Sequence, residues 1–160
     1  MKVVVIVKHE NFMRLALKES KKAQMKGDVP VGCVIVMNGR IIARAHNERE
    51  HKQVAIRHAE MIAIDRACRK LKSWRLEGCD IYITLEPCLM CAGAIINARI
   101  ENIYFGASDP KTGCIESQHK ILDSNFNHHT KAFGGILEKE CSENLQKFFK
   151  ELREEKKSKK

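Results

Sequence analysis

The pattern of apolar and polar positions in the first third of the chain predicts one helix followed by a β-hairpin. Apolar residues recur at helical spacing from about residue 10 to 26. Two apolar runs then follow, over residues 29–37 and 40–45, and Asn38-Gly39 separates them. Because this dipeptide favours a two-residue hairpin turn, we expect the two runs to pair as antiparallel strands.

The rest of the pattern predicts helices and strands that alternate. The expected elements are a helix over 58–71, a strand over 78–85, a helix over 87–98, a strand over 100–106 and a closing helix over 138–154. Residues 107–136 are expected to be mostly irregular. Alternation of this kind is typical of an α/β fold in which helices cover both faces of a sheet. We therefore expect a three-layer α/β/α sandwich, with parallel strands after the opening hairpin.

The length and composition of the chain predict one domain over residues 1–160. A chain of 160 residues with 44% hydrophobic content suffices for a single core, and no internal repeat or low-complexity linker divides it. Residues 1–8 are expected to form a leader or an extra strand, because the apolar run at 3–7 is too short to span a membrane. Residues 155–160 are expected to be a disordered basic tail.

Charge and cysteine content narrow the choice of partners and compartment. The 29 Lys and Arg residues outnumber the 20 Asp and Glu residues, for a formal charge of +9. This excess favours a polyanion such as nucleic acid or an acidic membrane surface, although solvated charged faces also produce it. Seven cysteines without a secretory signal favour reduced thiols in the cytosol, available as metal ligands, over a disulfide framework.

The candidate chemistry lies in two short segments, His58-Ala59-Glu60 and Pro87-Cys88-Leu89-Met90-Cys91, each at the expected start of a helix. His58 and Glu60 do not share a helix face, so they reach one centre only if it lies off the helix N-terminus. Two thiolates and a neutral imidazole bring Zn²⁺ close to neutrality and leave one tetrahedral position for water. Glu60 is then placed to move protons between water and substrate.

Two other interpretations of the Cys-x-x-Cys pair are a structural zinc site and a redox pair. A structural zinc site needs a fourth ligand, and none of the remaining cysteines and histidines stands at the usual spacing. A redox pair leaves His58 and Glu60 without a role. The combination of H-x-E with P-C-x-x-C is instead the pattern of zinc nucleobase deaminases.

Beyond this pattern, the sequence resembles bacterial tRNA adenosine deaminases from about His9 to Arg153. The resemblance rests on these further segments: Val29-Pro30-Val31-Gly32, Ala45-His46-Asn47, Trp74-Arg75-Leu76-Glu77-Gly78, Thr84-Leu85-Glu86, Ala92-Gly93 and Phe105-Gly106-Ala107-Ser108-Asp109-Pro110-Lys111. It implies a cytidine-deaminase-like fold with a mixed five-stranded sheet, and a cytoplasmic homodimer without a membrane anchor. It also implies conversion of adenosine to inosine at the wobble position of a tRNA anticodon stem-loop, with arginine tRNA as the expected substrate.

The same resemblance implies a role for individual residues. The zinc ligands would be His58, Cys88 and Cys91, with Glu60 as the proton shuttle. Asn47 would contact the flipped base, and the anticodon loop would be contacted by Asp109, Lys111, Asn127, Phe149 and Arg153. From the residues alone, Asn47 is also a candidate to terminate the hairpin. Phe149 is also a candidate core residue, because apolar neighbours surround it at helical spacing.

The sequence departs from the family pattern at two places near the proposed site. Arg57 stands where a small residue usually precedes the zinc histidine, and would either touch RNA or be solvated. Residues 114–117 replace a turn that commonly contains Gly-Ser, so the loop over the site is expected to differ in shape. Neither departure removes a catalytic group, so they bear on specificity more than on chemistry.

Two rival functions remain open at this point. A deaminase of free bases or nucleosides, of the guanine or cytosine type, would share the zinc site but would need no basic surface. A catalytically silent, zinc-containing RNA-binding subunit would have lost its acid/base residue. Asp109-Pro110-Lys111 argues against the first rival, and the presence of Glu60 argues against the second.

Overall fold

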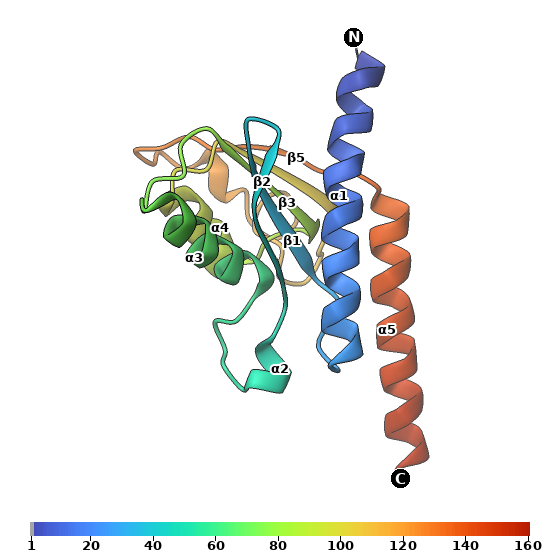
Figure 1. Ribbon diagram of the computed structural model, residues 1–160. Coiled ribbons are helices and arrows are strands. Elements are labelled where there is room, and N and C mark those ends of the chain that lie inside the picture. The colour runs from blue at the N-terminus through green and yellow to red at the C-terminus, as the bar shows by residue number, and fades with distance from the viewer. Residues whose placement is uncertain (1) are drawn as a thin grey trace.

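The computed structural model describes residues 2–160 and consists of one sheet with helices on both faces (Figure 1). In chain order the elements are α1 (Lys2–Met25), β1 (Gly32–Met37), β2 (Arg40–His46), α2 (Arg49–Lys52), α3 (Ala59–Leu71), β3 (Cys79–Leu85), α4 (Leu89–Asn97), β4 (Asn102–Ala107), a 3-10 turn (Ile121–Asp123), β5 (Lys131–Phe133) and α5 (Glu138–Ser158). The predicted alternation of helices and strands is confirmed.

The sheet is mixed and five-stranded, in the order β2-β1-β3-β4-β5. Strand β1 pairs antiparallel with both β2 and β3, whereas β3–β4 and β4–β5 are parallel. The hairpin turn at Asn38-Gly39 has positive φ at both residues, 50° and 74°, as the tight turns that suit twisted strands require. The predicted hairpin and the parallel strands that follow it are therefore confirmed.

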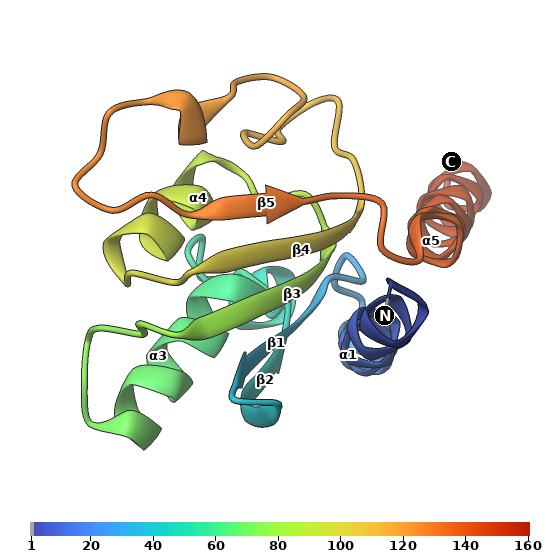
Figure 2. The same cartoon turned by 90° about the horizontal axis from the view of Figure 1, so that it is seen from above.

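Helices α3 and α4 cover one face of the sheet, and α1 and α5 cover the other (Figure 2). Strand β3 illustrates how one strand serves both layers, because successive side chains point to opposite faces. Ile81 and Ile83 belong to the core beneath α3 and α4, whereas Tyr82 packs with Met13 of α1. The expected three-layer α/β/α sandwich is confirmed.

The N-terminal segment is helical, which corrects the expectation of a leader or an extra strand over residues 1–8. Helix α1 already begins at Lys2, and Met1 lies outside the described residues. Valine is a poorer helix former than alanine by only about half a kcal/mol per residue, and extending an existing helix is far easier than starting one. No helix within residues 2–160 has both the length and the hydrophobicity needed to cross a membrane.

The C-terminal segment corrects a second expectation. Helix α5 continues to Ser158, so the disordered tail predicted for residues 155–160 is wrong up to that residue. Lys and Glu are good helix formers, and Lys156 and Lys157 lie in the last turn, where positive charge interacts favourably with the helix dipole. In Figure 1 this helix extends well beyond the sheet. Its basic end is therefore held in a defined direction.

Candidate active site

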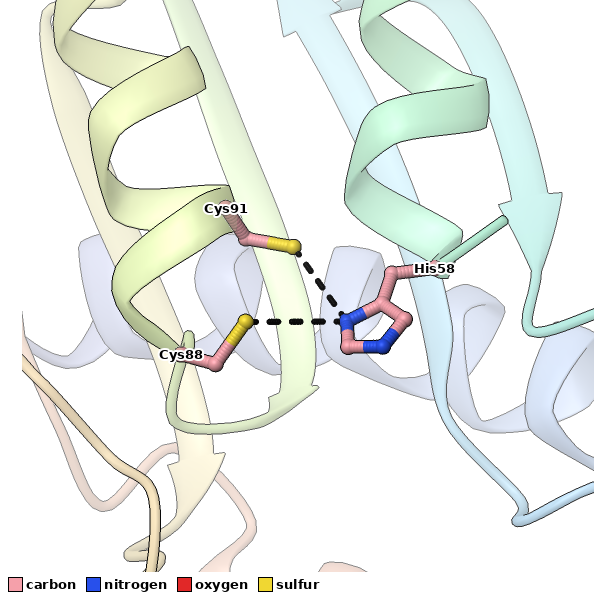
Figure 3. Close-up of side chains that lie close together, drawn as sticks. All are labelled: His58, Cys88 and Cys91. Atoms are coloured by element: carbon pink, nitrogen blue, oxygen red, sulfur yellow. Dashed lines mark hydrogen bonds between the residues drawn. The ribbon is translucent and has the colours of Figure 1, made fainter. Parts of the chain in front are cut away.

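Three metal-binding side chains meet where helices α3 and α4 begin (Figure 3). The Nδ1 atom of His58 lies 3.6 Å from Sγ of Cys88 and 3.5 Å from Sγ of Cys91. The three ligand atoms all lie within 4.8 Å of one another. The geometry agrees with the inference that the site lies off converging helix ends.

The local backbone explains why these side chains are available. His58 and Cys88 are the N-cap residues of α3 and α4, and both have extended backbone conformations. Their carbonyl groups accept the first helical hydrogen bonds, from the N–H groups of Ile62 and Ala92 at 3.1 and 2.8 Å. Neither side chain caps its own helix. Both are therefore free to turn toward the shared centre, where the two helix dipoles favour a thiolate.

The donor set suits zinc with one open coordination position. Two sulfur atoms and one imidazole nitrogen converge, and within residues 2–160 no fourth side chain joins the group. The hydrogen bond from the Cys91 thiol, followed by the hydrogen bond and charge of His58, lowers the pKa of Cys88 to about 4. The hydrogen bond to Cys88 and burial raise the pKa of Cys91 instead. One sulfur therefore carries the charge and the other carries a proton that a metal would displace.

Glu60 lies beside this group without belonging to it. Its side chain is buried, on the first turn of α3, and its carboxyl group is hydrogen-bonded to the Cys91 thiol. Burial raises the pKa of the Glu60 carboxyl above its ordinary value. A carboxyl group with a raised pKa is suited both to accept and to release a proton near neutral pH.

A cavity of about 620 Å³ leads from these residues to helix α5. Five residues predicted to contact RNA line it: Asn47, Asp109, Lys111, Phe149 and Arg153. The structure does not bring Asn127 to this cavity, since its exposed side chain lies in the loop before β5 and outside the lining. The cavity therefore unites most, but not all, of the predicted substrate contacts with the metal-binding group.

Asn47 has a structural role at the end of the hairpin, and its contact with a base stays a prediction. Its Nδ2 donates to the carbonyl of Val29 at 3.2 Å, and its Oδ1 accepts the N–H of Arg49 at 3.1 Å. The side chain thus stabilises the chain as it leaves β2, while also lining the cavity. One amide hydrogen and one oxygen lone pair remain for a ligand.

Phe149 is a surface residue of the cavity, which excludes the alternative that it belongs to the core. Its side chain is 40% exposed, whereas Leu145 and Phe148 on the same helix are buried. Asp109 instead has a local structural contact, because its carboxylate accepts the N–H groups of Lys111 and Thr112 at 3.0 and 3.2 Å. This turn directs the Lys111 segment along the cavity wall.

Comparison with known proteins places the chain in a family. Residues 6–107 match the family described as the cytidine and deoxycytidylate deaminase zinc-binding region. The tRNA-specific adenosine deaminase of Bacillus subtilis (strain 168) is 53% identical over 150 residues, which cover 93% of each chain. The chain belongs to the tRNA-specific adenosine deaminase family. It therefore carries a zinc-binding deaminase domain.

Solved structures agree with this membership. A structure from a study of A-to-I editing by tRNA:A34 deaminases at the wobble position of transfer RNA superposes with a TM-score of 0.82 and 43% identity, covering 84% of this chain and 99% of that one. A guanine deaminase from Bacillus subtilis has a TM-score of 0.59 and 30% identity, with coverage of 69% and 81%. The family's adenosine deaminases thus resemble this deaminase more closely, in both sequence and structure, than that free-base enzyme does.

Two buried carboxylates near the site of the deaminase were not identified from its sequence. Glu48 is buried and forms an ion pair with Arg57, whose side chain is still 39% exposed, so a contact of Arg57 with RNA stays a prediction. Glu86 is also buried, directly before the Pro87-Cys88 turn. The one signal for Glu86 was an acidic residue directly after the mostly apolar strand β3. Its hydrogen-bond partners are far along the chain, so no local pattern reveals them.

Proposed function

We propose that the protein catalyses hydrolytic deamination of adenosine to inosine at the wobble position of a tRNA anticodon, with arginine tRNA as substrate. The observation that supports this most is the cavity, which joins the His58, Cys88 and Cys91 group to a rim that carries basic and aromatic side chains. The names of the family's characterised members point to the same activity.

In this proposal His58, Cys88 and Cys91 hold the zinc ion. Zinc, when bound, supplies a Lewis acid that makes water a nucleophile near neutral pH. Glu60 accepts a proton from the attacking water and delivers it to N1 of adenine, and addition of the water oxygen at C6 is followed by loss of ammonia. Adenosine and water thus yield inosine and ammonia.

The rim of the cavity supports RNA as the substrate. An adenine inside a stacked helix is inaccessible, so a deaminase must receive a splayed-out base, which single-stranded loops present. Asn47 would hydrogen-bond this base inside the cavity. Lys111 and Arg153 would bind phosphates, and Phe149 would stack on a neighbouring base. Asp109 would act by shaping the loop.

A homodimer and a cytoplasmic location complete the proposal. Exposed apolar side chains that are not part of the cavity lining, such as Ile56, Trp74 and Leu89, provide surface for contact with a second subunit. Light scattering of the zinc-loaded protein tests this part, and a monomer at micromolar concentration would contradict it.

The substrate is tested by incubating the protein with arginine and non-arginine anticodon stem-loops, free adenosine, guanine and cytosine. We expect inosine from the arginine stem-loop alone. Turnover of a free base instead would support the guanine- or cytosine-type alternative. Bound zinc and bound RNA without released ammonia would indicate a catalytically silent subunit.

A further inference from the structure

Glu86 is a buried carboxylate next to the site that the mechanism does not use. It follows the last residue of β3 and precedes Pro87 and Cys88, and only 2% of its surface is exposed. A buried carboxylate is costly unless hydrogen bonds replace its water. The hydrogen-bond partners of Glu86 therefore show which part of the chain it holds in place.

All the hydrogen-bond partners of its carboxylate come from one segment, residues 109–117. Its Oε1 accepts three successive backbone N–H groups, those of residues 115, 116 and 117, at 3.2, 2.7 and 2.9 Å. Its Oε2 accepts the N–H of Asp109 at 2.9 Å and the hydroxyl of Ser117 at 2.5 Å. One side chain thus fixes both ends of a nine-residue stretch that has no helix or strand of its own.

The middle of this segment lies directly on the turn that carries Cys88. The N–H of Cys114 donates to the carbonyl of Pro87 at 2.9 Å, and Gly113 forms a β-bridge with Cys88. A Cβ atom at Gly113 would lie 2.1 Å from Oε2 of Glu86, so only glycine permits this approach. The segment, Glu86 and the turn of Cys88 therefore form one packed unit.

The first residues of the same segment, Asp109, Pro110, Lys111 and Thr112, form a wall of the cavity, and Glu86 itself also lines the cavity. We propose that Glu86 is a positioning residue, which fixes the RNA-facing wall of the cavity relative to the metal-binding turn through hydrogen bonds to the backbone of residues 109–117. This proposal rests on the proposed function, because the RNA-facing wall is defined by the binding of the RNA substrate. It assigns Glu86 no contact with substrate.

The test compares Glu86→Gln with the wild type in the zinc-loaded protein. Glutamine has nearly the same size, but its NH2 group can only donate hydrogen bonds, whereas the carboxylate oxygen that it replaces accepts them. We expect the amides of residues 109 and 115–117 to exchange hydrogen about tenfold faster, and KM for the stem-loop to rise about tenfold, each equivalent to roughly 1.4 kcal/mol. Zinc content should stay at the wild-type level, and kcat should fall much less than KM rises.

Ser117→Ala is the matched control, because it removes one hydroxyl donor and leaves the four backbone bonds. Ser117→Ala should change hydrogen exchange and KM less than Glu86→Gln does. Glu86→Asp keeps the carboxylate on a shorter side chain. Its hydrogen-exchange rates and its KM should lie between those of the wild type and those of Glu86→Gln. This variant keeps the test decisive if Glu86→Gln does not fold.

Unchanged hydrogen exchange in residues 109–117 would overturn the proposal. Loss of zinc with reduced kcat and unchanged KM would also overturn it, because Glu86 would then act on the metal-binding residues. A wild-type protein that does not convert the stem-loop would instead contradict the proposed function. The exchange measurement would still report whether Glu86 holds the segment.

Discussion

Arg57 donates hydrogen bonds from Nε and Nη2 to one carboxylate oxygen of the buried residue Glu48. The backbone reinforces this pair, since the N–H of Glu48 donates to the carbonyl of Arg57 at 3.0 Å. The two residues directly follow Asn47 and directly precede His58. The ion pair therefore closes the 49–56 segment and joins the proposed base contact to the proposed zinc ligand.

This relationship predicts a non-additive effect on stability. Arg57→Ala would leave Glu48 buried without its cation, and we expect a loss of about 1–2 kcal/mol in the free energy of unfolding, less than for a fully buried pair because Arg57 is 39% exposed. The double variant Glu48→Gln/Arg57→Ala should lose less than Arg57→Ala alone. Urea unfolding of the wild type and the variants measures these free energies. Losses that simply add would show that the two residues do not interact.

The same pair predicts how the effect depends on pH. Burial acts to raise the pKa of Glu48, but the hydrogen bonds and charge of Arg57 lower it below its ordinary value. A lowered pKa in the folded state stabilises the protein above the pKa of the unfolded chain, about 4.3, and this stabilisation is lost as the pH falls through the folded value. The difference between wild type and Arg57→Ala should therefore shrink in acid. A constant difference would contradict the ion pair.

Zinc binding should release protons. Because the pKa of Cys91 is raised and that of Cys88 is lowered to about 4, only Cys91 holds a thiol proton at neutral pH. The hydrogen bond with Cys88 also raises the pKa of His58 above its ordinary value. Below this raised pKa the imidazole is protonated, so zinc binding should then release the His58 proton in addition to the Cys91 proton. Zinc affinity should accordingly rise with pH.

Calorimetry in buffers of different ionisation enthalpy counts these protons. Cys114→Ser is the control, because this nearby buried cysteine is outside the metal-binding group and should leave the count unchanged. Zinc binding without proton release at neutral pH would show that the ligands differ from those assigned.

Phe149 should contribute to RNA binding by stacking. Phe149→Ala should raise KM for the stem-loop about tenfold, as expected for loss of one base–aromatic stack. Phe126→Ala is a matched control, because Phe126 is similarly exposed, at 38% against 40%, but lies outside the cavity lining. Equal KM values for the two variants would remove Phe149 from the binding surface.

The elements that could be predicted from sequence are those whose information is local. The hairpin follows from Asn38-Gly39, and α3 and α4 follow from helical periodicity over nine or more residues. The metal-binding group was also predictable, because His58 and Cys88 occupy N-cap positions and Cys91 follows Cys88 by three residues, on the same side of the first turn of α4. The three-residue strand β5 has too few positions to show any period. Its pairing with β4 depends on the rest of the sheet.

Errors arose where distant contacts or helix continuation decide the structure. The 1–8 segment was misjudged because a valine run suggests a strand, although the helix that follows it extends through it. The loop over the site owes its shape to Glu86, which lies more than twenty residues earlier in the chain. Asn127 was assigned by resemblance alone. The structure places it outside the cavity lining, and its contact with RNA stays a prediction.

The central claim is that Glu60 moves protons beside a zinc ion held by His58, Cys88 and Cys91. The most direct test measures zinc content and inosine formation on the arginine stem-loop in the same samples of wild type and Glu60→Ala. We predict about one zinc per chain in both, and a rate at least about a thousandfold lower in the variant, because the proton shuttle is missing. A zinc-loaded Glu60→Ala protein that forms inosine at the wild-type rate would contradict the mechanism.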